Sequence, residues 1–206
     1  MSLRALIASD WARYLTDGTR PPNRVRALLS QGWWAVFVYR LGHQTRAGGG
    51  LWHLGYPLAV LGYKVIELTT GISLQPDTKV GRGCYISHFG QIIIASTVEI
   101  GDNCNIGQGV TLGLGRKGRH WGAPRIGNRV FIGANAVIYG PVTIGDDAAI
   151  GPNCVVSENV PPRAVLRVPE PIVSGYRGSF AWVRYPGSQD DPERRASLAN
   201  GRAEEG

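Results

Sequence analysis

The sequence predicts a mainly β protein in which a parallel β-helix follows an α-helical N-terminal region. Between Val80 and Val160 an aliphatic residue returns every six positions and is usually followed by glycine. A period of six fits neither the 3.6-residue period of a helix nor the period of two of an ordinary strand. It fits a solenoid in which each hexad forms one flat side and three hexads close one coil.

The leading residue of each hexad is expected to point inward and to stack on its counterpart in the next coil. One phase holds Ile94, Ile100, Ile106 and Leu112, and a second holds Ile126, Ile132, Ile138, Ile144, Ile150 and Val156. The fifth position is expected to face inward near a corner, where only a small side chain fits. Its occupants are Cys84, Gly90, Val98, Cys104, Val110, Val130, Ala136, Val142, Ala148, Cys154 and Val160.

Three helices are expected ahead of the β-helix, in a helical region that spans residues 1–70. Amphipathic patterning and the Gly and Pro breakers define their limits. We expect them at residues 3–16, from Asn23 to the glycines at 48–50, and at residues 51–70. The second and third helices are expected to pack on each other and on the first coil of the β-helix.

The third helix is the most apolar segment, and it invites a membrane interpretation. It contains His53, Pro57, Lys64 and Glu67, whereas a spanning helix needs about 20 predominantly apolar residues. Packing in the protein is therefore the first interpretation. The alternative is a peripheral contact with the inner face of a membrane. Its aromatic face would consist of Trp33, Trp34, Phe37, Trp52 and Tyr56.

Composition narrows the class of protein. The 206 residues carry a net charge of +7, which favours a polyanionic partner such as a phosphate-rich cosubstrate. The arginines are scattered and no nucleic-acid-binding motif accompanies them, so no nucleic acid partner is expected. All three cysteines occupy inward fifth positions, which argues against a disulfide framework or a metal site and is compatible with a reducing cytoplasm. Arg4 and Asp10 interrupt the first apolar run too early for a signal peptide.

The chain leaves the repeat after Val160 through Pro161 and Pro162. We expect the β-helix to span residues 71–168 and a C-terminal extension to span residues 169–185. The segment from 186 to 206 is polar and charged, which predicts a disordered tail.

The hexads are interrupted between Leu112 and Ile126 by the insert LGLGRKGRHWGAP. An insertion in a solenoid must leave the coil as a loop, and such loops often lie on the binding face. The insert is rich in basic residues, namely Arg116, Lys117, Arg119 and His120. Its charge suits contacts with phosphates. A solvated surface loop is the alternative.

A second irregularity lies beside His88. The spacing between leading residues slips from six to eight just before Ile94, and His88 occupies the outward third position of its hexad. The predicted helices contain His43 and His53, so His88 and His120 are the histidines of the β-helix region. His88 is thus a candidate for proton-transfer chemistry.

These pieces together resemble a known family. The SHFG segment at 87–90, the GVTLG run at 109–113, the VPP exit at 160–162 and the hexads are similar to the hexapeptide-repeat acyltransferases, in their serine acetyltransferase branch. The resemblance covers about residues 71–168. It implies a left-handed β-helix, a homotrimer or a multiple of one, and acetyl-CoA bound in clefts between adjacent subunits. No metal is implied.

Transfer of an acetyl group to an alcohol needs a base for the hydroxyl proton and donors for the tetrahedral oxyanion. The resemblance assigns the base to His88. It places the backbone of Gly113 and Ala134, and the residue Pro152, along the pantetheine channel. Arg116 and Lys117 are our candidates for contacts with the CoA phosphates.

The match departs from the family at the acceptor site. Ser73 stands where the family orients its histidine with an aspartate, and Ser87 stands where a second aspartate helps to hold the amino acid. Gly122 and Ala123 occupy the places of an arginine-histidine pair that binds the substrate carboxylate. Arg119 and His120 come three residues earlier and serve only if the loop is rearranged.

These departures favour a neutral, polyhydroxylated acceptor, because an amino acid zwitterion in a desolvated cleft needs counter-charges. We therefore expect transfer to a sugar or polysaccharide hydroxyl, with Ser73 and Ser87 as hydrogen-bond partners. Phe89 or Trp121 would supply an aromatic surface. Two alternatives are serine O-acetyltransferase activity and an inactive scaffold that binds a partner.

Overall fold

The computed structural model describes residues 1–16, 21–48, 50–169, 192 and 195–196. Residues 1–168 form one compact unit. The expected C-terminal extension and tail lie outside the described residues, apart from residues 169, 192, 195 and 196.

The N-terminal region is helical, as expected. Its elements are α1 (Leu3–Leu15), α2 (Arg24–Leu28), α3 (Gln31–Ala47), the 3₁₀ helix η1 (Gly50–Gly55) and α4 (Tyr56–Thr70). Ser2 caps α1 by accepting a hydrogen bond from the amide of Ala5, and Asn23 caps α2 in the same way through Arg26. The single helix expected after Asn23 is wrong, because Ser30 adopts an extended backbone (φ −76°, ψ 119°) and separates α2 from α3.

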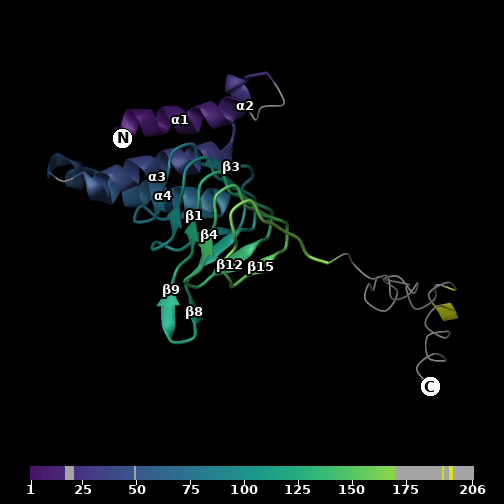
Figure 1. The fold of residues 1–206 in the computed structure, drawn as a ribbon. Helices are drawn as coiled ribbons and strands as arrows, with labels where there is room; N and C mark the ends of the chain where they lie inside the picture. Colours follow the sequence, from purple (N-terminus) through teal and green to yellow (C-terminus); the bar gives the residue numbers. More distant parts are fainter. Residues whose placement is uncertain (17–20, 49, 170–191, 193–194, 197–206) are drawn as a thin grey trace. The chain divides into compact units, whose positions relative to one another are not determined.

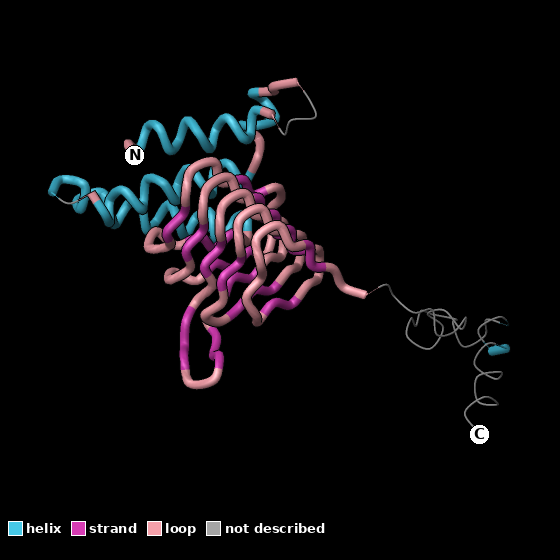
Figure 2. The backbone as a smooth tube through the Cα atoms, viewed as in Figure 1, coloured by secondary structure: helices cyan, strands magenta, loops and turns pink. Residues whose placement is uncertain are grey.

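The rest of the unit is a parallel β-solenoid of about five coils, which confirms the predicted fold (Figures 1 and 2). Three parallel sheets form its flat sides. Sheet A contains β1 (Ile72–Leu74), β4 (Ile92–Ile94), β7 (Thr111–Gly113), β12 (Val137–Tyr139) and β15 (Val155–Val156). Sheet B contains β2 (Lys79–Val80), β5 (Glu99–Ile100), β10 (Arg125–Ile126) and β13 (Thr143–Ile144). Sheet C contains β3 (Tyr85–Ile86), β6 (Asn105–Ile106), β11 (Phe131–Ile132), β14 (Ala149–Ile150) and β16 (Val165–Leu166).

The hydrophobic core is the stack of leading residues. Ile94 pairs with Leu112 in sheet A, and Ile132 pairs with Ile150 in sheet C, so like positions lie directly above one another. All ten leading residues named from the sequence are buried. The small fifth-position residues are buried too, except Gly90, which lies partly exposed in a turn with φ +99°. Burial raises the pKa of the Cys84 thiol to about 12, as suits a packing residue.

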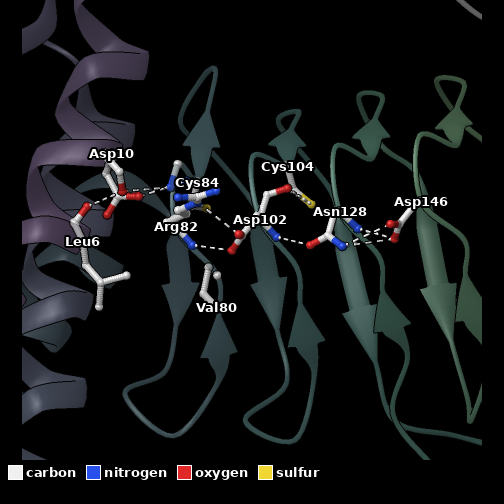
Figure 3. A network of polar contacts seen from close by, with 12 residues as sticks. Leu6, Asp10, Val80, Arg82, Cys84, Asp102, Cys104, Asn128 and Asp146 are labelled. Atoms are coloured by element: carbon white, nitrogen blue, oxygen red, sulfur yellow. Dashed lines mark hydrogen bonds and ion pairs between the residues drawn. The ribbon is translucent and has the colours of Figure 1, made fainter. Parts of the chain in front are cut away.

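One corner of the solenoid carries a ladder of polar side chains (Figure 3). The amide of Arg82 donates to Asp102 at 3.0 Å, and the amide of Asp102 donates to Asn128 at 2.9 Å. The amide of Asn128 continues the ladder by donating to Asp146 at 2.8 Å, and this bond lowers the pKa of Asp146. Each side chain thus satisfies a corner amide of the preceding coil.

The helices close the first coil with side-chain hydrogen bonds. Backbone amides of this coil donate to side chains of α1: Gly83 to Ser9 at 3.2 Å, Cys84 to Asp10 at 2.9 Å and Ile86 to Tyr14 at 2.8 Å. Side chains of α3 donate to its carbonyls: Tyr39 to Thr78 at 2.7 Å, and Arg40 to Val80 at 2.7 Å and to Gly81. Asp10 and Arg40 also form a buried ion pair at 2.8 Å. The helical layer thereby replaces a preceding coil.

The close approach of α3 to β3 depends on Gly32. A Cβ atom there would lie 2.2 Å from the carbonyl oxygen of Ile86, far inside van der Waals contact. Gly32→Ala is therefore expected to lower the free energy of unfolding by about 1–3 kcal/mol. Urea unfolding measures this change. Gly62→Ala in α4 is the matched control, since its Cβ would meet Val38 at 3.4 Å and alanine favours a helix. Equal destabilisation by both substitutions would contradict the steric explanation.

The aromatic face expected to rest on a membrane does not form as a unit. Trp33 is buried in the helical layer, with its ring 4.8 Å from Trp11 and 5.8 Å from Tyr14. The side chain of Trp52 lies outside the described part. Of the helices that the structure describes, none has both the length and the apolar character to cross a bilayer. Membrane contact by this face is unsupported.

Candidate active site

His88 lies in the turn between β3 and β4, where the coil contains extra residues. Leu74 pairs with Ile94, whereas Ile94 pairs with Leu112, so the first coil is two residues longer than the second. The extra length forms a turn in which Gly90 takes φ +99° and its amide donates to the carbonyl of Thr70 at 2.8 Å. The slip predicted beside His88 is therefore present, and the end of α4 holds its turn in place.

His88 opens into a cavity of about 730 Å³ between the first coil and the helices. The coil contributes Tyr85, Ser87 and His88 to its lining. The helical region contributes polar and cationic side chains, namely Arg13, Asn23, Arg26, Ser30 and Gln31. The volume lies in the range of small-molecule sites, and an exposed imidazole at its edge can contact a bound hydroxyl.

The neighbours of His88 in the sequence lie at the same turn. The hydroxyl of Ser87 donates to the carbonyl of Ile106 at 3.4 Å, a long contact that leaves its lone pairs available to an acceptor. Phe89, the next residue in the sequence, is 56% exposed and offers an apolar surface at this turn. Their assignment to acceptor binding stays a prediction.

Ser73 lies on β1, outside the lining of the His88 cavity. Its Oγ is 2.8 Å from Oη of Tyr63, which donates to Oε1 of Glu67 at 2.7 Å. Lys64 donates to Oε2 of the same carboxylate. Hydrogen bonds lower the pKa of Glu67 to about 2. The bond from Lys64 has the largest effect, followed by the bond from Tyr63. The hydroxyl of Tyr63 thus links the carboxylate of Glu67 to Ser73. Ser73 is the position where the family that the sequence resembles has an aspartate.

The basic insert forms the hairpin β8 (Gly115–Lys117) and β9 (His120–Gly122), which projects from the stacked coils (Figure 1). Arg119 and His120 are exposed on it, and neither lines the His88 cavity. Within one chain the structure therefore does not bring this pair to the candidate base. Arg116 donates to the carbonyl of Gly118 at 2.6 Å, which leaves other guanidinium donors for a phosphate. The side chain of Lys117 is outside the described part.

The expected pantetheine residues lie at two places along sheet A. Ala134 and Pro152 stack at one corner, where the amide of Asn153 donates to the carbonyl of Ala134 at 2.9 Å. Gly113 lies at the far end of β7 and pairs with Tyr139. Its carbonyl accepts from the amide of Gly140 at 3.1 Å. A ligand that contacts all three residues would run along the length of these strands.

Sequence reasoning missed the helical side of this site. Arg13, Asn23 and Arg26 carry no motif. They come to His88 only because α1 packs against β3 and α2 packs against α1 and α3. Tyr63 and Glu67 were missed for the same reason. Among the residues with described positions, no group of three or more His, Cys, Asp or Glu side chains could hold a metal ion.

Comparison with protein-family models identifies the class of protein to which this chain belongs. The model described as "Bacterial transferase hexapeptide (six repeats)" matches residues 123–158. A second, "Hexapeptide repeat of succinyl-transferase", matches residues 97–115. Together with the coils, these matches define a hexapeptide-repeat transferase.

Curated relatives define the branch. The chain is 38% identical over 134 residues to the serine acetyltransferase of Helicobacter pylori, which covers 65% of this chain and 75% of that protein. It is 37% identical over 158 residues to that of Mycobacterium tuberculosis, which covers 72% of this chain and 65% of that protein. The chain therefore belongs to the serine acetyltransferase family, and the resemblance found in its motifs is confirmed.

Solved structures agree with this assignment. Serine acetyltransferase isoform 3 of Entamoeba histolytica, in complex with cysteine, superposes with a TM-score of 0.70 at 27% identity. The match covers 87% of this chain but only 63% of that one, so this chain spans less than two thirds of its length. The Neisseria gonorrhoeae enzyme in complex with serine has a TM-score of 0.68 at 31% identity and covers 82% of this chain and 68% of that one.

Proposed function

We propose that this chain is an acetyl-CoA-dependent O-acetyltransferase with L-serine as its acceptor and His88 as its general base. The observation that carries the proposal is the position of His88 at the edge of a polar cavity, in a chain of the serine acetyltransferase family. Serine is the acceptor that the names of the relatives favour.

His88 would act twice in this reaction. Its imidazole takes the proton of the acceptor hydroxyl while that oxygen attacks the thioester carbonyl and forms the new C–O bond. Collapse of the tetrahedral intermediate breaks the C–S bond, and the imidazolium returns the proton to the departing thiolate. The products are the O-acetyl ester and free CoA, so protons and electrons balance.

The donor side rests on the hairpin and on sheet A. We assign the phosphates of acetyl-CoA to Arg116 and Lys117, because cationic side chains on a projecting hairpin suit them. We assign the pantetheine arm to Gly113, Ala134 and Pro152. The hairpin and His88 of one chain do not meet, which fits sites completed between subunits of a homotrimer.

The comparisons do not support the sugar or polysaccharide acceptor that the sequence departures favoured. The relatives are serine acetyltransferases, so the serine alternative fits them better. One observation keeps a carbohydrate as the second candidate. Of the cavity-lining residues whose positions the structure describes, none has a carboxylate to pair with an ammonium group. The hydroxyl of Ser87 suits either acceptor.

Acetyl-CoA turnover with a panel of acceptors tests this proposal. We expect release of free CoA with L-serine to exceed release with neutral sugars and polysaccharide fragments by at least tenfold, the discrimination expected of a site built around a substrate's polar groups. Turnover with sugars but not with serine would replace the first candidate by the second. Binding of CoA without turnover of any acceptor would favour the inactive scaffold.

A further inference from the structure

We propose that Arg13 of α1 binds an anionic group of the acceptor, which is the carboxylate if the acceptor is serine. The proposal rests on the proposed function only in taking the cavity beside His88 as the acceptor site. It names a determinant of acceptor choice in the helical region, outside the hexads and the hairpin.

The charge of the cavity is the first argument. Arg13 lines it together with His88, and among the described residues of its lining none is an aspartate or a glutamate. Asp10, the acidic residue of α1, does not neutralise Arg13, because its carboxylate is buried and bonded to Arg40 at 2.8 and 3.1 Å. A negatively charged ligand therefore suits Arg13 in the described part of this cavity.

The setting of Arg13 is the second argument. Its guanidinium donates to Oδ1 of Asn105 and lies over the ring of Tyr85, 5.8 Å from the centroid. A neutral amide and an aromatic ring orient the guanidinium without cancelling its charge. Because a guanidinium has five N–H donors in a planar fork, Arg13 keeps donors for a bidentate contact with a carboxylate.

The presence of Arg13 in the same chain as the candidate base is the third argument. Arg119 and His120, the expected carboxylate ligands, stand on the hairpin and do not reach the cavity of the same chain. A carboxylate that leaves water without a counter-charge is costly. Arg13 supplies the charge within the cavity that holds the candidate base.

The test compares two acceptors that differ in the carboxylate alone. L-serine and L-serinamide share the hydroxyl and the amino group. Arg13→Gln is expected to raise KM for L-serine roughly ten- to a hundredfold, the range for a hydrogen-bonded charge, and to leave KM for L-serinamide within about twofold. Arg13→Lys should recover part of the loss, because it restores the charge without the planar fork.

Controls separate binding from folding. Arg4→Gln removes an exposed arginine of the same helix and should leave both KM values unchanged. Thermal unfolding of each variant checks that the fold survives. Equal changes of KM for serine and serinamide in Arg13→Gln would overturn the proposal, as would no change for either.

Failure of the proposed function remains distinguishable from failure of this inference. If the wild-type enzyme acetylates neither serine nor serinamide, calorimetric titrations with D-glucuronate and D-glucose replace the kinetic test. These two sugars also differ in the presence of a carboxylate. If glucuronate binds more tightly than glucose and Arg13→Gln abolishes the difference, the anion site is supported although serine is not the acceptor. Absence of L-serine and glucuronate binding to the wild-type protein would overturn the anion site itself.

Discussion

Replacing His88 with asparagine is expected to lower kcat for acetyl transfer by roughly 10²–10⁴-fold, the usual contribution of a positioned general base. Asparagine retains polarity and approximate size but cannot take the proton of the acceptor hydroxyl. Because the phosphate and pantetheine contacts assigned here involve other residues, KM for acetyl-CoA should change little. Steady-state rates of CoA release, measured across a range of pH, give both constants.

A histidine outside the cavity provides the control for this experiment. His53 is exposed in η1, so His53→Asn should keep kcat within about twofold of the wild-type value, as surface substitutions usually do. If His88→Asn also retains wild-type kcat and pH dependence, another group is the base. The donor assignments could then still hold, because they do not depend on the imidazole.

Substituting Asp10 with alanine is expected to lower the free energy of unfolding by about 3–5 kcal/mol, the cost of leaving one member of a buried ion pair unpaired. Asp10 is fully buried, binds Arg40 through both carboxylate oxygens and accepts from the amide of Cys84. Its removal leaves the buried Arg40 without its counter-charge and that amide without an acceptor. Urea unfolding followed by circular dichroism measures the change.

An exposed ion pair in the same region serves as the control for the effect of burial on stability. Asp77 binds Arg46 at 2.5 Å, but the two side chains are 43% and 54% exposed. Asp77→Ala should therefore change the free energy of unfolding by less than about 1 kcal/mol. An Asp10→Ala variant as stable as Asp77→Ala would mean that water or a rearranged helix replaces the buried pair.

The solenoid was predictable because its information is local and repeated. Each hexad independently places an aliphatic residue in the core, so single errors do not change the fold. Gly90 shows the limit, since the pattern assigns it to the core although the two extra residues of its coil push it into an exposed turn. The division between α2 and α3 was missed because Ser30 can occupy a helix as well as its cap.

The candidate site was predictable only on its solenoid side. His88 could be proposed as the base because it lies beside a break in a regular spacing and within a segment that resembles the family's motif. Arg13 could not, since its contact with Asn105 joins residues separated by 92 positions and depends on how α1 packs. The same holds for the link from Ser73 through Tyr63 to Glu67, which needs the angle of α4 against β1.

The hydrogen bonds between the helices and the first coil also limit how copies of the protein can associate. The terminal strands of a β-structure present unpaired amides and carbonyls, which other chains can extend into a fibre. Here Ser9, Asp10 and Tyr14 occupy amides at this terminus, while Tyr39 and Arg40 occupy carbonyls. These hydrogen bonds therefore disfavour strand addition onto β2 and β3.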